Sequence, residues 1–212
     1  MTQLNNRINE KMKEHDSRMK VRDIEMRLQP RIELVAPARK FIKEGKLTKI
    51  CRKSDQPYQF VLFSDLLLYG DLLNNEDKSL KVHRQITIDN SFRVRDIPQN
   101  AKYGTKCFEI HSPEKSFIVF GDHPGIKHEW LQVFSELTEK QSTLKTPKRR
   151  PAPLWLPDDF TKQCMMPNCN NIFTFMRRRH HCRYWYEPLS TKRNFKNIWK
   201  ERERERNTLP TS

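Results

Sequence analysis

Short β-type runs between residues 41 and 120 constrain the fold of this chain most strongly. Apolar and β-branched residues gather in short runs that are bounded by turn residues. Ser54-Asp55-Gln56-Pro57 and Ser112-Pro113-Glu114 have the chemistry of such turns. The seven predicted strands are residues 43–51, 58–63, 66–70, 80–88, 92–96, 106–111 and 115–120. The pattern predicts a small antiparallel β-sandwich or barrel with short connections.

An amphipathic helix is expected directly after the seventh strand. The turn and helix start is Gly121-Asp122-His123-Pro124, and the apolar residues that follow at helical spacing are Ile126, Trp130, Val133, Phe134 and Leu137. Hydrophobic residues make up only 35% of the chain, so one core is expected and it should lie here. We therefore expect a mainly β fold with α, in which a seven-stranded β-sandwich or barrel is capped by a C-terminal helix.

This order of elements resembles a pleckstrin homology (PH) domain at residues 36–140. The segments that carry the resemblance are Lys-Glu-Gly-Lys-Leu-Thr-Lys at 43–49, Phe-Val-Leu-Phe-Ser-Asp-Leu-Leu-Leu-Tyr at 60–69, and Glu129-Trp130. The resemblance implies a basic cup for inositol phosphates at the end of the first strand, where the candidate lipid-binding residues are Lys49, Arg52 and Lys53. Asp55 intrudes on this cup, and Tyr58 stands where relatives often carry a basic residue. Solvated charge at a strand end is the alternative interpretation.

The first 35 residues are predicted to be a charged amphipathic helix. Residues 3–29 lack Gly and Pro, and Pro30 should end the helix. A narrow stripe at helical spacing consists of Leu4, Ile8, Met12, His15 and Met19. The stripe could lie on a neighbouring element of the chain or form a partner face for a coiled-coil protein.

Residues 141–154 read as a basic, Pro-rich linker. The segment combines three prolines with four cations, Lys145, Lys148, Arg149 and Arg150, and is not expected to build a core. These cations could be merely solvated, or they could add attraction to an acidic membrane leaflet.

Three cysteines after the linker have spacings that suit zinc. Cys164 and Cys169 form a close pair, and Cys182 follows thirteen residues later. The chain has 5 cysteines, an odd number that favours a reducing compartment in which thiols serve packing or metal binding.

The order Trp155-x-x-Asp158, cysteine pair, Arg-Arg-His-His-Cys-Arg at 178–183 resembles the front half of a FYVE zinc finger at residues 155–184. The resemblance implies that phosphatidylinositol 3-phosphate is bound by Trp155, Asp158, Arg178, Arg179, His180, His181 and Arg183. It also implies a Zn²⁺ site that includes Cys164, Cys169 and Cys182. The first pair is wider than usual, Trp185 stands where the next cysteine is expected, and residues 183–212 contain no cysteine. We therefore expect a finger truncated after its first half, an incomplete zinc site, and a charged tail at residues 185–212 that is helical or disordered.

A PH domain followed by a FYVE finger resembles phafin-type adaptors and the C-terminal part of exchange factors of the FYVE, RhoGEF and PH class. The first resemblance implies an adaptor that binds phosphoinositide membranes in endosomal trafficking. The second implies a fragment of a Rho-family guanine nucleotide exchange factor in actin and GTPase signalling, with a small GTPase as partner. The sequence shows no Gly-rich phosphate loop or paired nucleophile and base, so we expect no enzymatic activity and no nucleotide exchange.

A formal net charge of +15 indicates a polyanionic partner, which could be acidic lipid or nucleic acid. A basic RNA-binding protein is therefore a further alternative. The aromatic residues are not arranged as a stacking platform, so we do not expect nucleic acid. The sequence contains no apolar run long enough to span a bilayer. These features predict a cytoplasmic protein that is peripheral on endosomal membranes.

Overall fold

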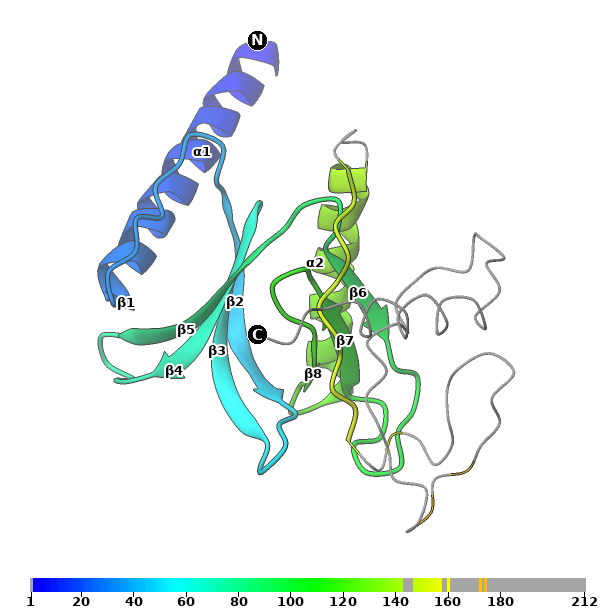
Figure 1. The fold of residues 1–212 in the computed structure, drawn as a ribbon. Coiled ribbons are helices and arrows are strands. Elements are labelled where there is room, and N and C mark those ends of the chain that lie inside the picture. The colour runs from blue at the N-terminus through cyan, green and yellow to red at the C-terminus, as the bar shows by residue number, and fades with distance from the viewer. Residues whose placement is uncertain (1, 143–146, 158–159, 161–171, 173, 175–212) are drawn as a thin grey trace, which may run out of the picture.

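A computed structural model describes residues 2–142, 147–157, 160, 172 and 174. Within these residues the chain forms one sheet and two helices (Figure 1). The elements are α1 (Thr2–Arg27), β1 (Leu28–Gln29), β2 (Phe41–Lys49), β3 (Gln56–Phe63), β4 (Leu66–Leu72), β5 (Leu80–Thr87), β6 (Arg93–Asp96), β7 (Cys107–His111), β8 (Phe117–Phe120) and α2 (Pro124–Ser142). Neither helix is long and apolar enough to cross a membrane.

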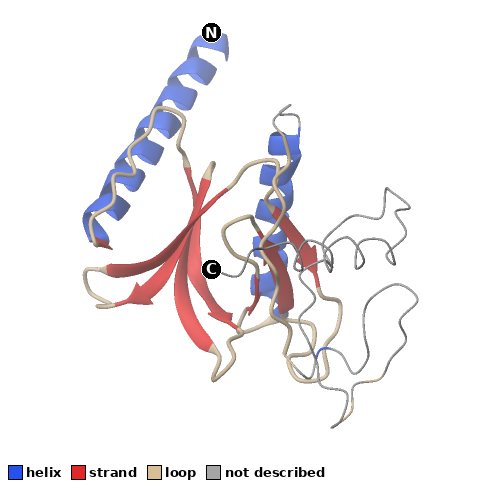
Figure 2. Cartoon of the chain, in the orientation of Figure 1, coloured by secondary structure: helices blue, strands red, loops and turns tan. Residues whose placement is uncertain are grey.

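The strands follow the order β1-β5-β4-β3-β2-β8-β7-β6. Strands β2 to β5 and strands β6 to β8 are two antiparallel meanders, and β8 joins them by pairing with the end of β2. Figure 2 shows the two groups of strands with α2 lying against the second. All seven predicted strands are confirmed, with ends within two residues of the prediction. The sequence reading missed β1, a two-residue strand that pairs in parallel with β5.

The predicted C-terminal helix is confirmed as α2, and it closes the main core. Trp130 of α2 is 1% exposed, and its ring centroid lies 6.3 Å from that of Phe60 and 5.6 Å from that of Phe134. The indole lies against Gly45 of β2, where a Cβ would be in van der Waals contact with a Trp130 ring carbon at 3.4 Å. Burial of such aromatic side chains is the main source of stability in a domain of this size.

Helix α1 packs on the outer face of the sheet through a stripe other than the predicted one. Val21, Ile24 and Leu28 are buried against Val61 and other apolar residues of β3, β4 and β5. Ile8, Met12, His15 and Met19 are exposed, so of the two alternatives for this stripe, the one in which it lies on a neighbouring element is wrong. The side chain of Leu4 lies outside the described residues. Only the C-terminal half of α1 lies next to the apolar patch on the outer face of β3, β4 and β5, so only that half is buried against the sheet.

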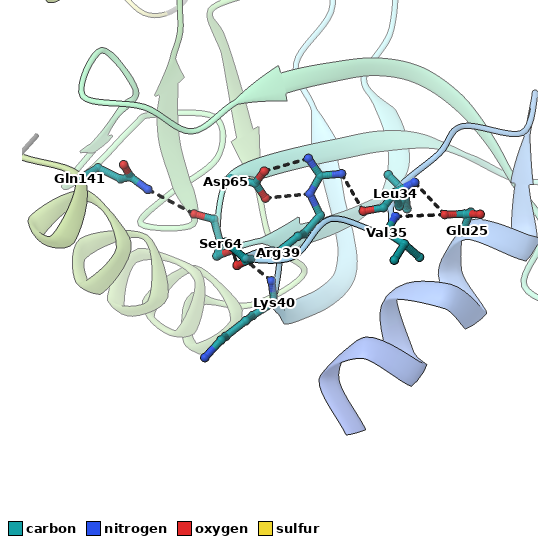
Figure 3. Close-up of polar contacts among 9 residues, drawn as sticks. Glu25, Leu34, Val35, Arg39, Lys40, Ser64, Asp65 and Gln141 are labelled. Carbon is teal, nitrogen blue, oxygen red and sulfur yellow. Dashed lines mark hydrogen bonds and ion pairs between the residues drawn. The ribbon is translucent and has the colours of Figure 1, made fainter. Parts of the chain in front are cut away.

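The connector between α1 and β2 is held by charged side chains (Figure 3). The Glu25 carboxylate accepts hydrogen bonds from the backbone N–H groups of Leu34 at 2.8 Å and Val35 at 3.1 Å. These bonds lower the pKa of Glu25, partly against the effect of burial. Arg39 donates two hydrogen bonds of 2.8 Å to Asp65 in the β3–β4 turn. The connector is thereby held to the helix by Glu25 and to the β3–β4 turn by Arg39.

Part of the predicted linker is bound to the sheet. The backbone N–H of Arg149 donates to the Ser91 hydroxyl at 2.8 Å, and its guanidinium contacts Asp89 at 2.8 Å and Glu114 at 3.2 Å. The Ala152 N–H donates to the Ser112 carbonyl, and Leu154 is buried. Of the four cations of the linker, Arg149 is ion-paired, Lys148 and Arg150 are exposed, and Lys145 lies outside the described residues. We call residues 147–157 the strap.

Candidate lipid-binding site

Lys49, the last residue of β2, carries its ammonium group into a cage of aromatic rings. Its Nζ lies 5.2 Å from the ring centroid of Tyr69, 5.3 Å from that of Phe117 and 5.9 Å from that of Tyr58. It also donates to the Tyr69 hydroxyl at 3.4 Å. Desolvation by burial lowers the pKa of Lys49, while the electron-rich ring faces favour the cation. The cage holds a poorly hydrated positive charge at the end of the barrel interior.

Arg52 and Lys53 lie in the β2–β3 loop, a few residues beyond Lys49, and both are exposed. The structure therefore brings the three predicted basic residues to one end of the sheet but gives them different surroundings. Lys49 is half-buried among rings, whereas the other two side chains extend from the loop into solvent. Exposed cations beside a partly desolvated one form a surface that attracts phosphate groups.

Asp55, which the sequence reading placed as an intruder in this cup, is bound elsewhere. The Tyr103 hydroxyl donates a hydrogen bond to its carboxylate at 2.9 Å. Tyr103 packs with Ile50 and Ile118 in a cluster separate from the core that contains Tyr69 and Phe117. Because consecutive residues of an extended chain point to opposite faces, Lys49 and Ile50 face different clusters. The negative charge of Asp55 is thus held on the side of Tyr103.

Arg84 of β5 is a member of this site that sequence reasoning missed. Its charge lowers the pKa of Lys49 further, after burial. Burial raises the pKa of Tyr69, and the charge and hydrogen bond of Arg84 oppose that rise. In the β4–β5 register Tyr69 is the partner of Arg84. The strand assignment alone could have found this cation if cross-strand pairs with the aromatic residues had been examined.

His83 and Asp71 stand beside Arg84 at the rim of the site. The His83 Nε2 lies 2.7 Å from the Asp71 carboxylate, and the His83 ring centroid is 5.1 Å from that of Tyr58. Tyr58, which we noted as a departure from a basic residue, thus contributes a ring to the cage around Lys49. Burial raises the pKa of Tyr58. Tyr58 therefore stays an uncharged phenol at neutral pH.

The chain has strong similarity to two groups of curated proteins. It is 31% identical over 197 residues to mouse (Mus musculus) FYVE, RhoGEF and PH domain-containing protein 6, which covers 84% of this chain and 14% of that protein. It is 36% identical over 159 residues to chicken (Gallus gallus) pleckstrin homology domain-containing family F member 2, which covers 71% of this chain and 59% of that protein. The chain is a homologue of the PH–FYVE proteins. It spans less than two thirds of the length of either relative.

Solved structures bear out the PH fold. A linker–DH/PH structure of p115-RhoGEF has a TM-score of 0.52 at 18% identity and covers 67% of this chain and 44% of that chain. A structure of autoinhibited Vav1 has a TM-score of 0.54 at 18% identity and covers 64% of this chain and 25% of that chain. No protein-family model matches the chain. The eight-stranded sheet with α2 is thus a PH-type fold, as the sequence predicted.

One predicted lipid-binding residue of the FYVE-like segment lies in the described chain. Trp155 is partly buried and packs, with Leu156 and Phe160, on the cluster that contains Tyr103. The others lie outside the described residues, namely Asp158, Arg178, Arg179, His180, His181 and Arg183. The predicted zinc ligands Cys164, Cys169 and Cys182 do so too. The residues that the structure describes contain no cluster of His, Cys, Asp and Glu suited to a metal ion.

Cys107 of β7 belongs to the same cluster as Tyr103. It is buried, and burial raises the pKa of its thiol to about 11. The thiol is therefore protonated at neutral pH and acts as a packing group.

Proposed function

We propose that this chain is a phosphoinositide-binding module that attaches peripherally to membranes through the basic end of its PH-type sheet. One observation carries the proposal: Arg52 and Lys53 are exposed beside the caged Lys49, while Asp55 is bound by Tyr103. The Asp55 carboxylate is thereby held on the side of Tyr103, and the Asp71 carboxylate at the rim lies 2.7 Å from His83 Nε2. The chain is also homologous to proteins that are named for their PH domain, which supports the same proposal.

The side chains of this site suit an inositol phosphate headgroup. The guanidinium groups of Arg52 and Arg84 can each donate two hydrogen bonds to phosphate oxygens. The ammonium of Lys49 is partly desolvated, so its interaction with a phosphate would be less weakened by water than that of an exposed lysine. Lys53 adds charge at the rim of the site. The rings around Lys49 fix the position of its charge before a ligand arrives.

We also propose a lipid, a metal and a location for this chain on the basis of its sequence. Residues 155–184 would bind phosphatidylinositol 3-phosphate through Trp155 and the basic run that ends at Arg183, as the FYVE resemblance implies. Cys164, Cys169 and Cys182 would provide thiolate ligands for Zn²⁺. Endosomal membranes in the cytoplasm are the proposed location, since that lipid is the proposed ligand. Metal analysis of the purified chain tests the zinc assignment directly.

Vesicle cosedimentation at low and physiological salt tests the proposed function. We compare vesicles that carry phosphatidylinositol 3-phosphate, other phosphoinositides, or phosphatidylserine at matched surface charge. The triple variant Arg52→Ala, Lys53→Ala, Arg84→Ala should lose most of the binding. The matched control is Arg93→Ala, Arg95→Ala, Lys115→Ala, which removes three exposed cations from β6 and from the β7–β8 turn and should bind normally.

Two results separate the site on the sheet from the finger. Normal binding by the triple variant, together with loss in Arg178→Ala with Arg179→Ala, would transfer the lipid role to residues 155–184. Failure of the unaltered chain to bind any phosphoinositide vesicle at low salt would refute the proposal. Competition with RNA distinguishes the nucleic-acid alternative, which requires displacement of the chain from vesicles by RNA at low concentration.

A second candidate is a fragment of a Rho-family exchange factor with a small GTPase as partner, which the match to the FYVE, RhoGEF and PH domain-containing protein suggests. This match covers 84% of the chain, whereas the match to the family F protein covers 71%. We propose that the chain by itself does not catalyse exchange, because residues 2–40 supply one helix, a two-residue strand and a connector to the sheet. Nucleotide release from purified Rho-family GTPases is the test. Acceleration above the intrinsic rate would refute this proposal and favour the exchange-factor reading.

A further inference from the structure

Helix α1 exposes a row of apolar side chains that the rest of the described chain leaves uncovered. The exposed fractions are 48% for Ile8, 60% for Met12, 54% for Met19 and 64% for Met26. Successive members are four, seven and seven residues apart. At 3.6 residues per turn these positions fall on one side of the helix. The side chains of α1 that face the sheet, Val21 and Ile24, lie on the opposite side of the helix.

The seven-residue spacing places this stripe at the seam positions of a two-stranded coiled coil. Met12, Met19 and Met26 occupy one seam position of the heptad, and Ile8 occupies the other. Such a seam needs a second helix because a row of exposed apolar side chains gains free energy when it is removed from water.

The charges beside the stripe identify the partner. Lys11 and Arg18 lie along one edge of the stripe, and Asp16 and Asp23 lie along the other. In a parallel pair of identical helices, Lys11 of one copy faces Asp16 of the second, and Arg18 faces Asp23. In an antiparallel pair the acidic edge would face the acidic edge and the basic edge the basic edge. The pattern is therefore self-complementary in the parallel arrangement only.

We propose that α1 mediates a parallel homodimer of this chain through the stripe Ile8, Met12, Met19 and Met26. Figure 1 shows α1 at the margin of the molecule, with its N-terminal half extending past the sheet. In residues 7–16 every side chain whose burial is described is exposed. A helical segment of this length is only marginally stable in water, so a second helix would stabilise it. The two sheets of the dimer would lie on opposite sides of the pair of helices.

Two polar side chains limit the strength of this dimer. Arg22 occupies a seam position between Met19 and Met26, and His15 occupies the equivalent position between Met12 and Met19, where apolar side chains are preferred. Asp23 also contacts Arg27 at 3.4 Å within its own helix, so its pairing with Arg18 of the second copy is shared. We therefore expect a concentration-dependent dimer. Arg22→Leu should tighten it by at least about tenfold in dissociation constant, because two leucines then join the seam.

Sedimentation equilibrium of the whole chain over a wide concentration range tests the proposal. Lys11→Glu with Arg18→Glu should make the chain monomeric, because both edges of the stripe are then acidic. Asp16→Lys with Asp23→Lys should do the same with two basic edges. An equal mixture of these two variants should form a heterodimer. The control, Arg7→Glu with Lys13→Glu, changes the charge equally at exposed positions outside the seam and should leave dimerisation unchanged.

Three outcomes would overturn the proposal. The first is a chain that is monomeric at every concentration. The second is a dimer that persists in both charge-reversed variants. The third is a monomer whose exposed stripe inserts into vesicles, detected as loss of vesicle binding in Met12→Glu with Met19→Glu. All these substitutions are at exposed positions, and circular dichroism should confirm that each variant keeps the fold.

Discussion

The Tyr103 hydroxyl donates a 2.9 Å hydrogen bond to Asp55. This bond joins the β2–β3 loop to the segment between β6 and β7, which is far away in the sequence. Asp55 belongs to the β2–β3 loop that carries Arg52 and Lys53. The Tyr103 ring packs against Phe120 at 5.0 Å and against Phe160, just beyond the strap, at 6.0 Å between centroids. The β2–β3 loop and the start of the FYVE-like segment are therefore neighbours.

Removal of this hydroxyl should affect both stability and membrane binding. Tyr103→Phe keeps the ring contacts but leaves the Asp55 carboxylate without its donor, so we expect a loss of about 1 kcal/mol in the free energy of unfolding. The freed carboxylate should also weaken phosphoinositide binding by neutralising Arg52 or Lys53. Urea unfolding and vesicle cosedimentation measure the two effects. Asp55→Asn in the same background should restore vesicle binding, and absence of this rescue would show that Asp55 does not oppose lipid.

Replacement of Lys49 should weaken vesicle binding without lowering the free energy of unfolding. Lys49→Met fills the same space among Tyr58, Tyr69 and Phe117 without a buried charge, so vesicle binding should fall while stability at pH 7 stays equal or rises. Burial lowers the pKa of Lys49 from its ordinary value of 10.5, so burial penalises folding only while the ammonium is charged. The stability advantage of Lys49→Met should therefore shrink as pH rises towards 10.5. A large loss of stability at pH 7 would contradict this account.

Glu25 should make the attachment of α1 sensitive to acid. Backbone N–H donors lower its pKa below the ordinary value of 4.5. The ionised carboxylate is thus favoured by folding, and its contribution is present above pH 4.5 and lost as pH falls through the lowered pKa. Glu25→Gln should cost about 1 kcal/mol at pH 7 and progressively less below pH 4.5. Thermal unfolding of both proteins across this range checks the sign, and a pH-independent difference would refute it.

The strap should detach when its buried side chain is shortened. Leu154 is 7% exposed and packs with Ile50 and Cys107. Leu154→Ala should cost about 2 kcal/mol in unfolding free energy and expose residues 147–157 to limited proteolysis. Lys148→Ala is the control, because Lys148 is exposed and its loss should leave cleavage unchanged. Equal protection of both variants would mean that the strap is held by the contacts of Arg149 instead.

The strands and α2 were predictable because their signals are local. Alternation of apolar and polar residues sets which face of a strand is buried, and turn residues such as those at 54–57 interrupt it. The predicted ends still differ by up to two residues. Lys43 was the predicted start of a strand that begins at Phe41, since strand ends depend on the pairing partner as well as on the residue itself.

The contacts of α1 and of the strap were not predictable in the same way. The exposed stripe around Met12 has regular helical spacing, yet the sheet binds Val21, Ile24 and Leu28. The strap is rich in Pro and cations, but Arg149 and Leu154 find partners in Asp89 and Ile50. Both outcomes depend on surfaces created by residues far away in the chain.

The sequence by itself determined which segments form strands, where the closing helix lies, and that Lys49, Arg52 and Lys53 lie at one strand end. Each of these features depends on residues that are only a few positions apart. Only the tertiary structure decided that Lys49 lies among three rings, that Arg84 joins it, and that Asp55 is bound by Tyr103. These contacts join residues from 9 to 68 positions apart. Their geometry exists only after the two meanders of the sheet have come together at β2 and β8.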